Sequence, residues 1–412
     1  MKLIKLFFLL IPFGGSAQHD TVTVDEAIAL ALKNNLGLHA ASQNILYHQQ
    51  LKKTASEIPR TEIGFMYGQY NSIVRDNNIS FLQSIPFPTV FSSKSTLAQS
   101  QVKASEAKKS MTEKELVLQI KEIYYQLLYL NERRQQLEQQ DSLFRGLAQA
   151  ITKKLQAGEA TQLEMTKTIA QHNEIRNLIN QNSADQIIYE SHLQALLHHP
   201  HPLSIAHFKL EPLPFPDELD SVDIEVSPNL QFMKQQVSIS ESMKRIEKAR
   251  ILPEFKVGFF SQTLVGTQKI NGQDQFFGLG KRFTGLQVGL SLPIWFIPQT
   301  AQIKAGGMAK KGAEFEYEQS KINWWAQTRE AYQQAFKHKT SLDYYTSSGL
   351  PMARLIQQQA LLSFRQGEIS FMEFLLNMNQ ALSIKEAHLQ TLLRYNQSII
   401  RIEFFTTQKQ QQ

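Results

Sequence analysis

The chain has 412 residues, no cysteine and a formal net charge of +6. Without cysteine it can form no disulfide and can use no thiolate as a metal ligand or nucleophile. The small basic excess is spread along the chain, and no basic run is interleaved with aromatic residues, which argues against a nucleic-acid-binding protein.

The first 17 residues have the organisation of a secretory signal peptide. Lys2 and Lys5 provide the positive start, an apolar run covers residues 3–12, and small residues at 15–17 form a cleavage site. The apolar run is too short to cross about 30 Å of hydrocarbon as a helix. We therefore expect residues 1–17 to be removed on export.

The remaining chain contains an internal two-fold repeat, with halves at 18–222 and 223–412. Each half opens with a predicted helix start. The first is a capping box from Thr23 to Glu26. The second is Ser227, predicted as a serine N-cap, followed by Pro228 at the first helical position.

Each half continues with a predicted strand hairpin, at 60–88 and 254–293. In both hairpins the second strand ends in a Ser-aliphatic-Pro sequence, and the last strand alternates apolar residues with polar or small ones. The segment 265–282 is rich in Gly, Gln and Asn, and we expect it to be a long loop between the strands of the second hairpin.

Each half ends in a predicted long helical hairpin, at 92–197 and 300–405. Apolar residues recur with alternating spacings of four and three in both, as in a coiled coil. Residues 92–155 contain no proline and would form a rod of roughly 96 Å at about 1.5 Å per residue. Gly158 and Gly367 are predicted to turn the chain between antiparallel helices in the left-handed conformation.

This duplicated set of elements resembles the TolC-like family of outer membrane efflux proteins over essentially the whole chain after the signal peptide. The opening segment 23–35 and both Gly-Glu turns carry the resemblance. It implies a mostly α fold with a small β part, in which long coiled-coil hairpins and four strands per chain form a trimer. The three subunits would share a twelve-stranded β-barrel in the outer membrane of a Gram-negative cell and an α-helical tunnel in the periplasm.

The hydrogen-bonding needs of the backbone also predict assembly of several chains, because two strand hairpins alone would leave backbone groups unpaired in lipid. Further copies of the chain would close the sheet, and the resemblance implies a homotrimer. It also implies a passive exit duct that docks a periplasmic adaptor and an inner-membrane pump, either of the resistance-nodulation-division type or of type I protein secretion. No short signature of catalysis or phosphate binding occurs, so we predict no enzyme and no cofactor.

Two other functions stay open. A periplasmic coiled-coil scaffold or adaptor would explain the long helices and the signal peptide, but it would not explain two strand hairpins. A heavy-metal-binding export component would use the histidine-rich linker, where the candidate ligands are His198, His199, His201 and His207. Prolines interrupt that run and remove regular helical spacing, so a solvated linker is the alternative reading.

The helical turns carry the remaining predicted site residues. The resemblance implies that the tips at Gly158, Glu159, Gly367 and Glu368 contact the adaptor. The alternative is that these glycines only form turns.

A gate is predicted close to the second tip. Glu373 lies six residues after Gly367 and matches an acid that gates the channel in the family. Three copies could form a ring that attracts cations, although an ordinary solvated surface glutamate is the alternative. Glu164 is the counterpart in the first half. Leu376 replaces the family's next acid, which weakens the prediction of a paired acidic gate.

Overall fold

The computed structural model describes residues 21–200, 203–206, 209–216 and 224–406. The predicted signal peptide, His201 and His207 lie outside these ranges. The chain divides into two compact units, each described by itself. The first comprises Met1–Leu38, Glu113–Val222 and Gln327–Gln412, and the second comprises His39–Thr112 and Asp223–Ala326.

The elements follow the predicted order. Those of the first half are β1 (Thr21–Val22), α1 (Val24–Asn34), α2 (Leu36–Lys52), η1 (Lys53–Ser56), β2 (Glu62–Gly68), β3 (Asp76–Ile85), α3 (Pro88–Gln156), α4 (Gln162–Leu197) and β4 (Ser204–Ile205). Those of the second half are η2 (Ile224–Val226), α5 (Pro228–Ala249), β5 (Glu254–Thr263), β6 (Gly266–Ile270), β7 (Gln273–Phe277), β8 (Arg282–Ser291), α6 (Phe296–Tyr344), η3 (Tyr345–Gly349), α7 (Leu350–Gln366) and α8 (Phe371–Phe405).

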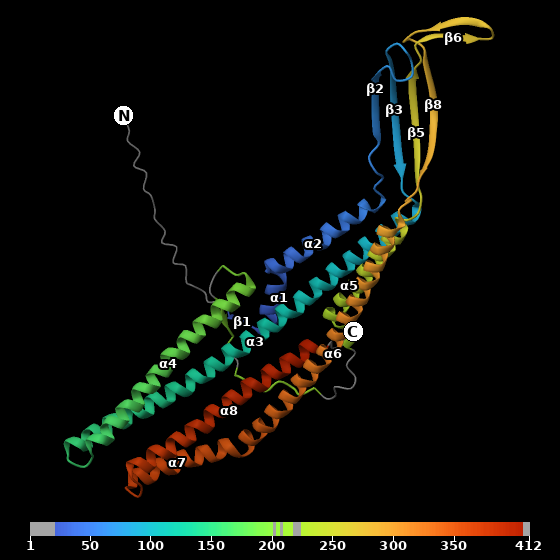
Figure 1. The fold of residues 1–412 in the computed structure, drawn as a ribbon. Coiled ribbons are helices and arrows are strands. Elements are labelled where there is room, and N and C mark those ends of the chain that lie inside the picture. Colours follow the sequence, from blue (N-terminus) through green and yellow to red (C-terminus); the bar gives the residue numbers. More distant parts are fainter. Residues whose placement is uncertain (1–20, 201–202, 207–208, 217–223, 407–412) are drawn as a thin grey trace, which may run out of the picture. The chain divides into compact units, whose positions relative to one another are not determined.

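The second unit contains a four-stranded antiparallel sheet in the order β2-β3-β5-β8 (Figure 1). Its register places Phe81 opposite Phe259 and Val257 opposite Val288. Since successive side chains point to opposite faces, the alternating residues of all four strands gather on one apolar face. The strand hairpins predicted from the two halves thus form a single sheet, whose edges are β2 and β8.

The prediction of a long loop at 265–282 is wrong, because most of this segment forms a separate two-stranded hairpin. Strands β6 and β7 pair with each other and lie beyond the end of the four-stranded sheet (Figure 1). Asn271 and Gly272 join them, with φ values of 52° and 82°. Two consecutive positive φ values are the requirement of a type I′ turn, for which Asn-Gly is the preferred sequence.

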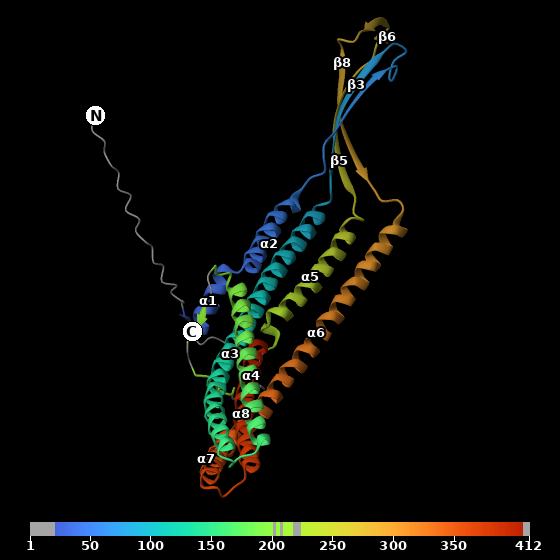
Figure 2. The same ribbon diagram turned by 90° about the vertical axis from the view of Figure 1, so that its left-hand side faces the viewer.

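The first unit is built around helical hairpins, and Figures 1 and 2 both show α3 and α4 as one antiparallel pair and α7 and α8 as another. The predicted coiled-coil seam of α3 is buried, and its members include Ile120, Leu127, Leu130, Leu137 and Phe144. Helix α3 extends over 69 residues, which confirms the predicted long rod.

The linker between the halves is packed more closely than expected of a solvated segment. Strand β4 pairs in parallel with β1, and Leu203 and Leu210 belong to the hydrophobic core of the unit. The buried Asn396 side chain accepts from the Leu213 N–H (2.9 Å) and donates to the Glu211 carbonyl (2.8 Å). This segment of the linker is therefore held against α8.

Both predicted helix starts are found at the predicted positions, but one of the two predicted capping contacts is absent among the described residues. Thr23 and Glu26 form the predicted capping box. Ser227 immediately precedes α5 as predicted, but its side chain makes no capping hydrogen bond, and its hydroxyl is buried without a partner in the described part of the chain. The N-cap prediction is therefore right about the helix boundary and wrong about the side-chain contact.

Candidate functional site: the helical tips

The two glycine turns have the same backbone geometry. Gly158 and Gly367 have φ values of 78° and 76°, in the left-handed region. At each turn the glycine and the following glutamate return hydrogen bonds to the preceding helix; Glu368 N–H, for example, donates to the Ser363 carbonyl at 2.9 Å. These bonds satisfy carbonyl groups that a helix end leaves unpaired. The predicted turns are confirmed in position and conformation.

Both predicted gate residues take part in capping boxes. Glu373 is the third residue of α8; its carboxylate accepts from the Ser370 N–H at 2.9 Å, and Ser370 Oγ accepts from the Glu373 N–H at 3.3 Å. Glu164 makes the same pair of bonds with Thr161 at the start of α4. Each glutamate therefore stabilises a helix start, and Glu373 is also exposed to solvent.

Apolar side chains surround Glu373 on the surface of α8. Met372 is 48% exposed and Leu376 is 69% exposed, one helical turn apart. Helix α7 also exposes an apolar stripe, formed by Met352, Leu355 and Leu362. Exposed apolar groups of this extent call for a partner surface or a functional explanation.

An aromatic cluster supports the second tip from within. The Phe364 ring stacks on the Phe374 ring at a centroid distance of 4.6 Å, and Phe371 meets Phe364 edge-on at 6.1 Å. Lys154 of α3 lies 5.8 Å from the Phe364 centroid, which links the two hairpins by a cation–π contact. The sequence analysis missed this cluster, although its three phenylalanines flank the Gly-Glu turn.

Ion pairs also join α3 to α8. Lys121 pairs with Glu403 at 2.6 Å, and Arg133 pairs with Glu386 at 3.1 Å. Tyr129 donates its hydroxyl to the same Glu386 carboxylate at 3.2 Å. Burial, reinforced by the neighbouring Glu386 charge, raises the pKa of Tyr129 to about 12.

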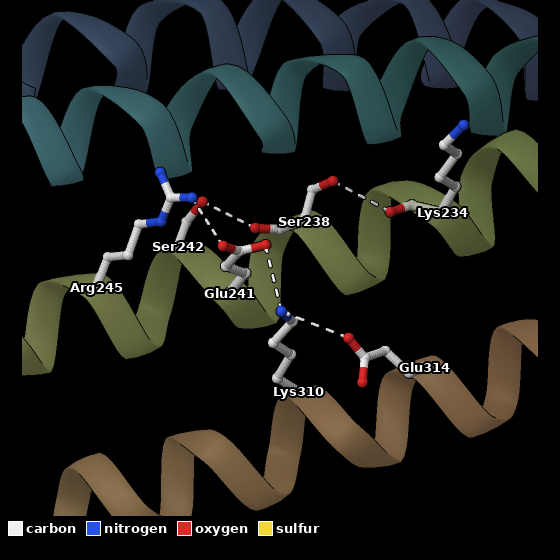
Figure 3. Close-up of polar contacts among 7 residues, drawn as sticks. All are labelled: Lys234, Ser238, Glu241, Ser242, Arg245, Lys310 and Glu314. Carbon is white, nitrogen blue, oxygen red and sulfur yellow. Dashed lines mark hydrogen bonds and ion pairs between the residues drawn. The ribbon is translucent and has the colours of Figure 1, made fainter.

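The second unit has its own ionic contact, between α5 and α6 (Figure 3). Lys310 of α6 lies 3.6 Å from Glu241 of α5 and 3.4 Å from Glu314 of its own helix, and Glu241 also pairs with Arg245 at 2.7 Å. Helices α5 and α6 lie close together next to this contact: a Cβ added at Gly306 of α6 would lie 3.3 Å from the Cα of Lys244 of α5.

The described residues contain no group of three or more His, Asp or Glu side chains placed to hold a metal ion. His198 ends α4 in the left-handed conformation, with a φ of 47°. Because His201 and His207 lie outside the described ranges, the four-histidine metal site stays a prediction. None of the described helices is long and apolar enough to cross a membrane.

No protein-family model matches the chain, and no curated protein matches it. Solved structures do match. The outer-membrane channel OprN has a TM-score of 0.78 at 15% identity, over 93% of this chain and 89% of that chain. The Campylobacter jejuni outer membrane channel CmeC has a TM-score of 0.75 at 15% identity, over 93% and 85%. The open state of the Neisseria gonorrhoeae outer membrane channel MtrE has a TM-score of 0.75 at 13% identity, over 93% and 88%.

These matches define the class of fold, which is that of outer-membrane channels. More particularly, the chain has the TolC-like fold of the outer membrane efflux proteins, as the sequence resemblance predicts.

Proposed function

We propose that the chain is the channel subunit of a tripartite efflux system, resident in the outer membrane of a Gram-negative cell with its long helical hairpins in the periplasm. The observation that carries this proposal is the match of 93% of the chain to several outer-membrane channels, with TM-scores of 0.75–0.78. In this role the protein is a passive exit duct and not an enzyme.

The exposed apolar face of the four-stranded sheet supports residence in lipid. Leu286 and Val288 of β8 are 81% and 80% exposed, and Ile63 of β2 is 70% exposed. On β8 the alternate positions Gly285, Gln287 and Gly289 are small or polar, as expected of the opposite face in a channel wall. An apolar face of this kind in water would be an aggregation site.

The unpaired edges of the sheet support closure by identical subunits. Among the described strands, β2 and β8 each have a neighbour on one side only. In a bilayer the open backbone groups would each cost several kcal/mol, so the sheet must close. Three chains with four strands each would form a twelve-stranded barrel, and each β8 would pair with β2 of the next subunit.

Helix α6 offers a second surface for the same assembly. Met308, Phe315 and Ile322 are exposed and separated by seven residues, which places them along one stripe of the helix. A neighbouring subunit would bury this stripe. The sheet edges and the helical stripe therefore both support a homotrimer.

The tips would contact the adaptor and form the periplasmic gate. The turns at Gly158-Glu159 and Gly367-Glu368 present short exposed segments at the ends of long helical hairpins. Glu373, with Leu376 next to it, would surround the constriction as a charged and apolar ring. The inner-membrane pump would supply the energy, and a resistance-nodulation-division pump is the proposed partner.

Membrane fractionation and planar-bilayer recording of the purified protein test the proposal. We expect the chain to remain in the outer-membrane fraction after a high-salt wash and to give discrete conductance steps. A well-folded trimer that is released by salt and produces no conductance would favour the periplasmic scaffold. Tight metal binding that is lost in His198→Ala and His199→Ala variants would favour a metal-binding export component.

A further inference from the structure

The long helices that follow the two strand hairpins differ in continuity. Helix α3 runs unbroken for 69 residues, whereas its counterpart is divided into α6, η3 and α7 with 49, 5 and 17 residues. The second helix is thus two residues longer than the first. A π-helical turn uses a wider hydrogen-bond spacing and accommodates an additional residue, so η3 absorbs part of this surplus.

The backbone ladder is weak at η3 for three local reasons. The Leu350 N–H donates to the Tyr345 carbonyl, five residues earlier, in place of the usual four. Pro351 follows and has no N–H to donate back into the turn. Ser347 Oγ donates to the Asp343 carbonyl at 2.7 Å, which is a side-chain bond to a backbone acceptor of the helix.

Helix α8 holds one side of η3. Gly349 is buried, and a Cβ there would lie 2.9 Å from Tyr345 Cδ1 and 3.5 Å from Ile384 Cγ2 of α8. The Tyr345 ring meets the His388 ring of α8 edge-on at 6.5 Å. The other side of the turn, at Thr346 and Ser347, is exposed. The turn is therefore packed against α8 on one side and exposed on the other.

We propose that η3 is the hinge of the channel gate, at which α7 bends relative to α6 around Gly349 when the tip opens. A sharp bend in a helix is expected at a π-helical turn or a proline, and this segment has both. Because α3 is continuous, the bend is confined to the second half, which also carries Glu373 and the exposed apolar stripe of α7. The inference rests on the proposed function, since a gate exists only in a channel.

Amide hydrogen exchange on the purified full-length protein tests the hinge without any conductance measurement. We expect the amides of residues 345–350 to exchange about tenfold or more faster than those of the adjoining turns of α6 and α7. The equivalent segment of α3, residues 136–142, should be as protected as its own neighbours. Equal protection of residues 345–350 and their flanks would overturn the hinge.

Variants at Thr346 connect the hinge to gating, because this side chain is exposed. Deletion of Thr346 should replace the wide turn by regular α-helix, slow exchange in the segment and reduce the frequency of channel opening about tenfold or more. Thr346→Ala is the matched control of unchanged chain length and should behave as the wild type. Normal opening in a folded deletion variant whose exchange has slowed would refute the proposal.

Pro351→Ala covers the case in which the deletion variant does not fold. It keeps the chain length and restores the missing N–H, so the exchange rate at residues 345–350 and the opening frequency should both fall. Unchanged values of both in Pro351→Ala would count against the hinge. If neither the wild type nor Thr346→Ala conducts, the proposed channel function fails, and the exchange pattern of the wild type alone decides whether η3 is a flexible turn.

Discussion

The glycine turns allow a direct test of how backbone conformation stabilises the tips. A Cβ added at Gly367 would meet no atom within 4 Å, and the same holds for Gly146 inside α3. The two positions differ in φ, which is 76° at Gly367, whereas Gly146 is not among the residues with positive φ. Comparing alanine substitutions at the two sites therefore separates the free-energy cost of the left-handed backbone conformation from any effect of side-chain packing.

The expected effects have opposite signs. Gly367→Ala places an L-residue in the left-handed region and should destabilise the turn by about 1–2 kcal/mol. Gly146→Ala removes flexibility from a helix interior and should stabilise α3 locally by about 0.5–1 kcal/mol. Gly367→Asn should lose less than Gly367→Ala, because asparagine tolerates this conformation better.

Amide exchange in the last turn of α7 and the first turn of α8 measures the result. A loss of about 1–2 kcal/mol in local stability corresponds to exchange roughly 5–30 times faster. Gly146→Ala is the control and should leave these amides unchanged. Exchange at the second tip that is identical in wild type and Gly367→Ala would refute the conformational argument.

Three further predictions address the gate and the core. Glu373→Gln should keep the capping box but lower the preference of the channel for cations in planar bilayers. Glu373→Ala should lower both the cation preference and the amide protection of the first turn of α8. Unchanged ion selectivity in both variants would exclude a charged ring. Leu376→Asp should raise cation preference if this side chain lines the constriction, and an unaltered reversal potential would place it elsewhere. The raised pKa of Tyr129 means that the folded state binds the phenolic proton more tightly than the unfolded state. The protonated phenol therefore contributes to stability below pH 10, and this contribution is lost as the pH rises from about 10 to about 12. Tyr129→Phe should therefore reduce the alkaline loss of stability in an unfolding titration, and an identical pH profile would contradict this.

Several features could be read from the sequence because they depend on local chemistry. Gly158 and Gly367 mark turns since few other residues adopt a positive φ, and the Thr23–Glu26 capping box needs only residues three apart. The Asn271-Gly272 pair is an equally local signal for the β6–β7 hairpin, which the prediction of a loop at 265–282 did not use. Pro351 was a similar sign of the interruption at η3.

Other features depend on partners far apart in the sequence. Ser227 has the right residue type for a cap, yet its hydroxyl is buried and has no partner among the described residues. The rings of Phe364, Phe371 and Phe374 stack within the α7–α8 hairpin, but the contact with Lys154 of α3 forms only when the two hairpins meet.

The sequence by itself determined the order of strands, long helices and turns, because hydrophobic periodicity and turn residues act over a few residues along the chain. Only the tertiary structure decided the strand order β2-β3-β5-β8 and the packing of the linker against α8. It also decided that Leu376 stays exposed. These outcomes depend on register, burial and side-chain direction, which are set when distant segments pack together.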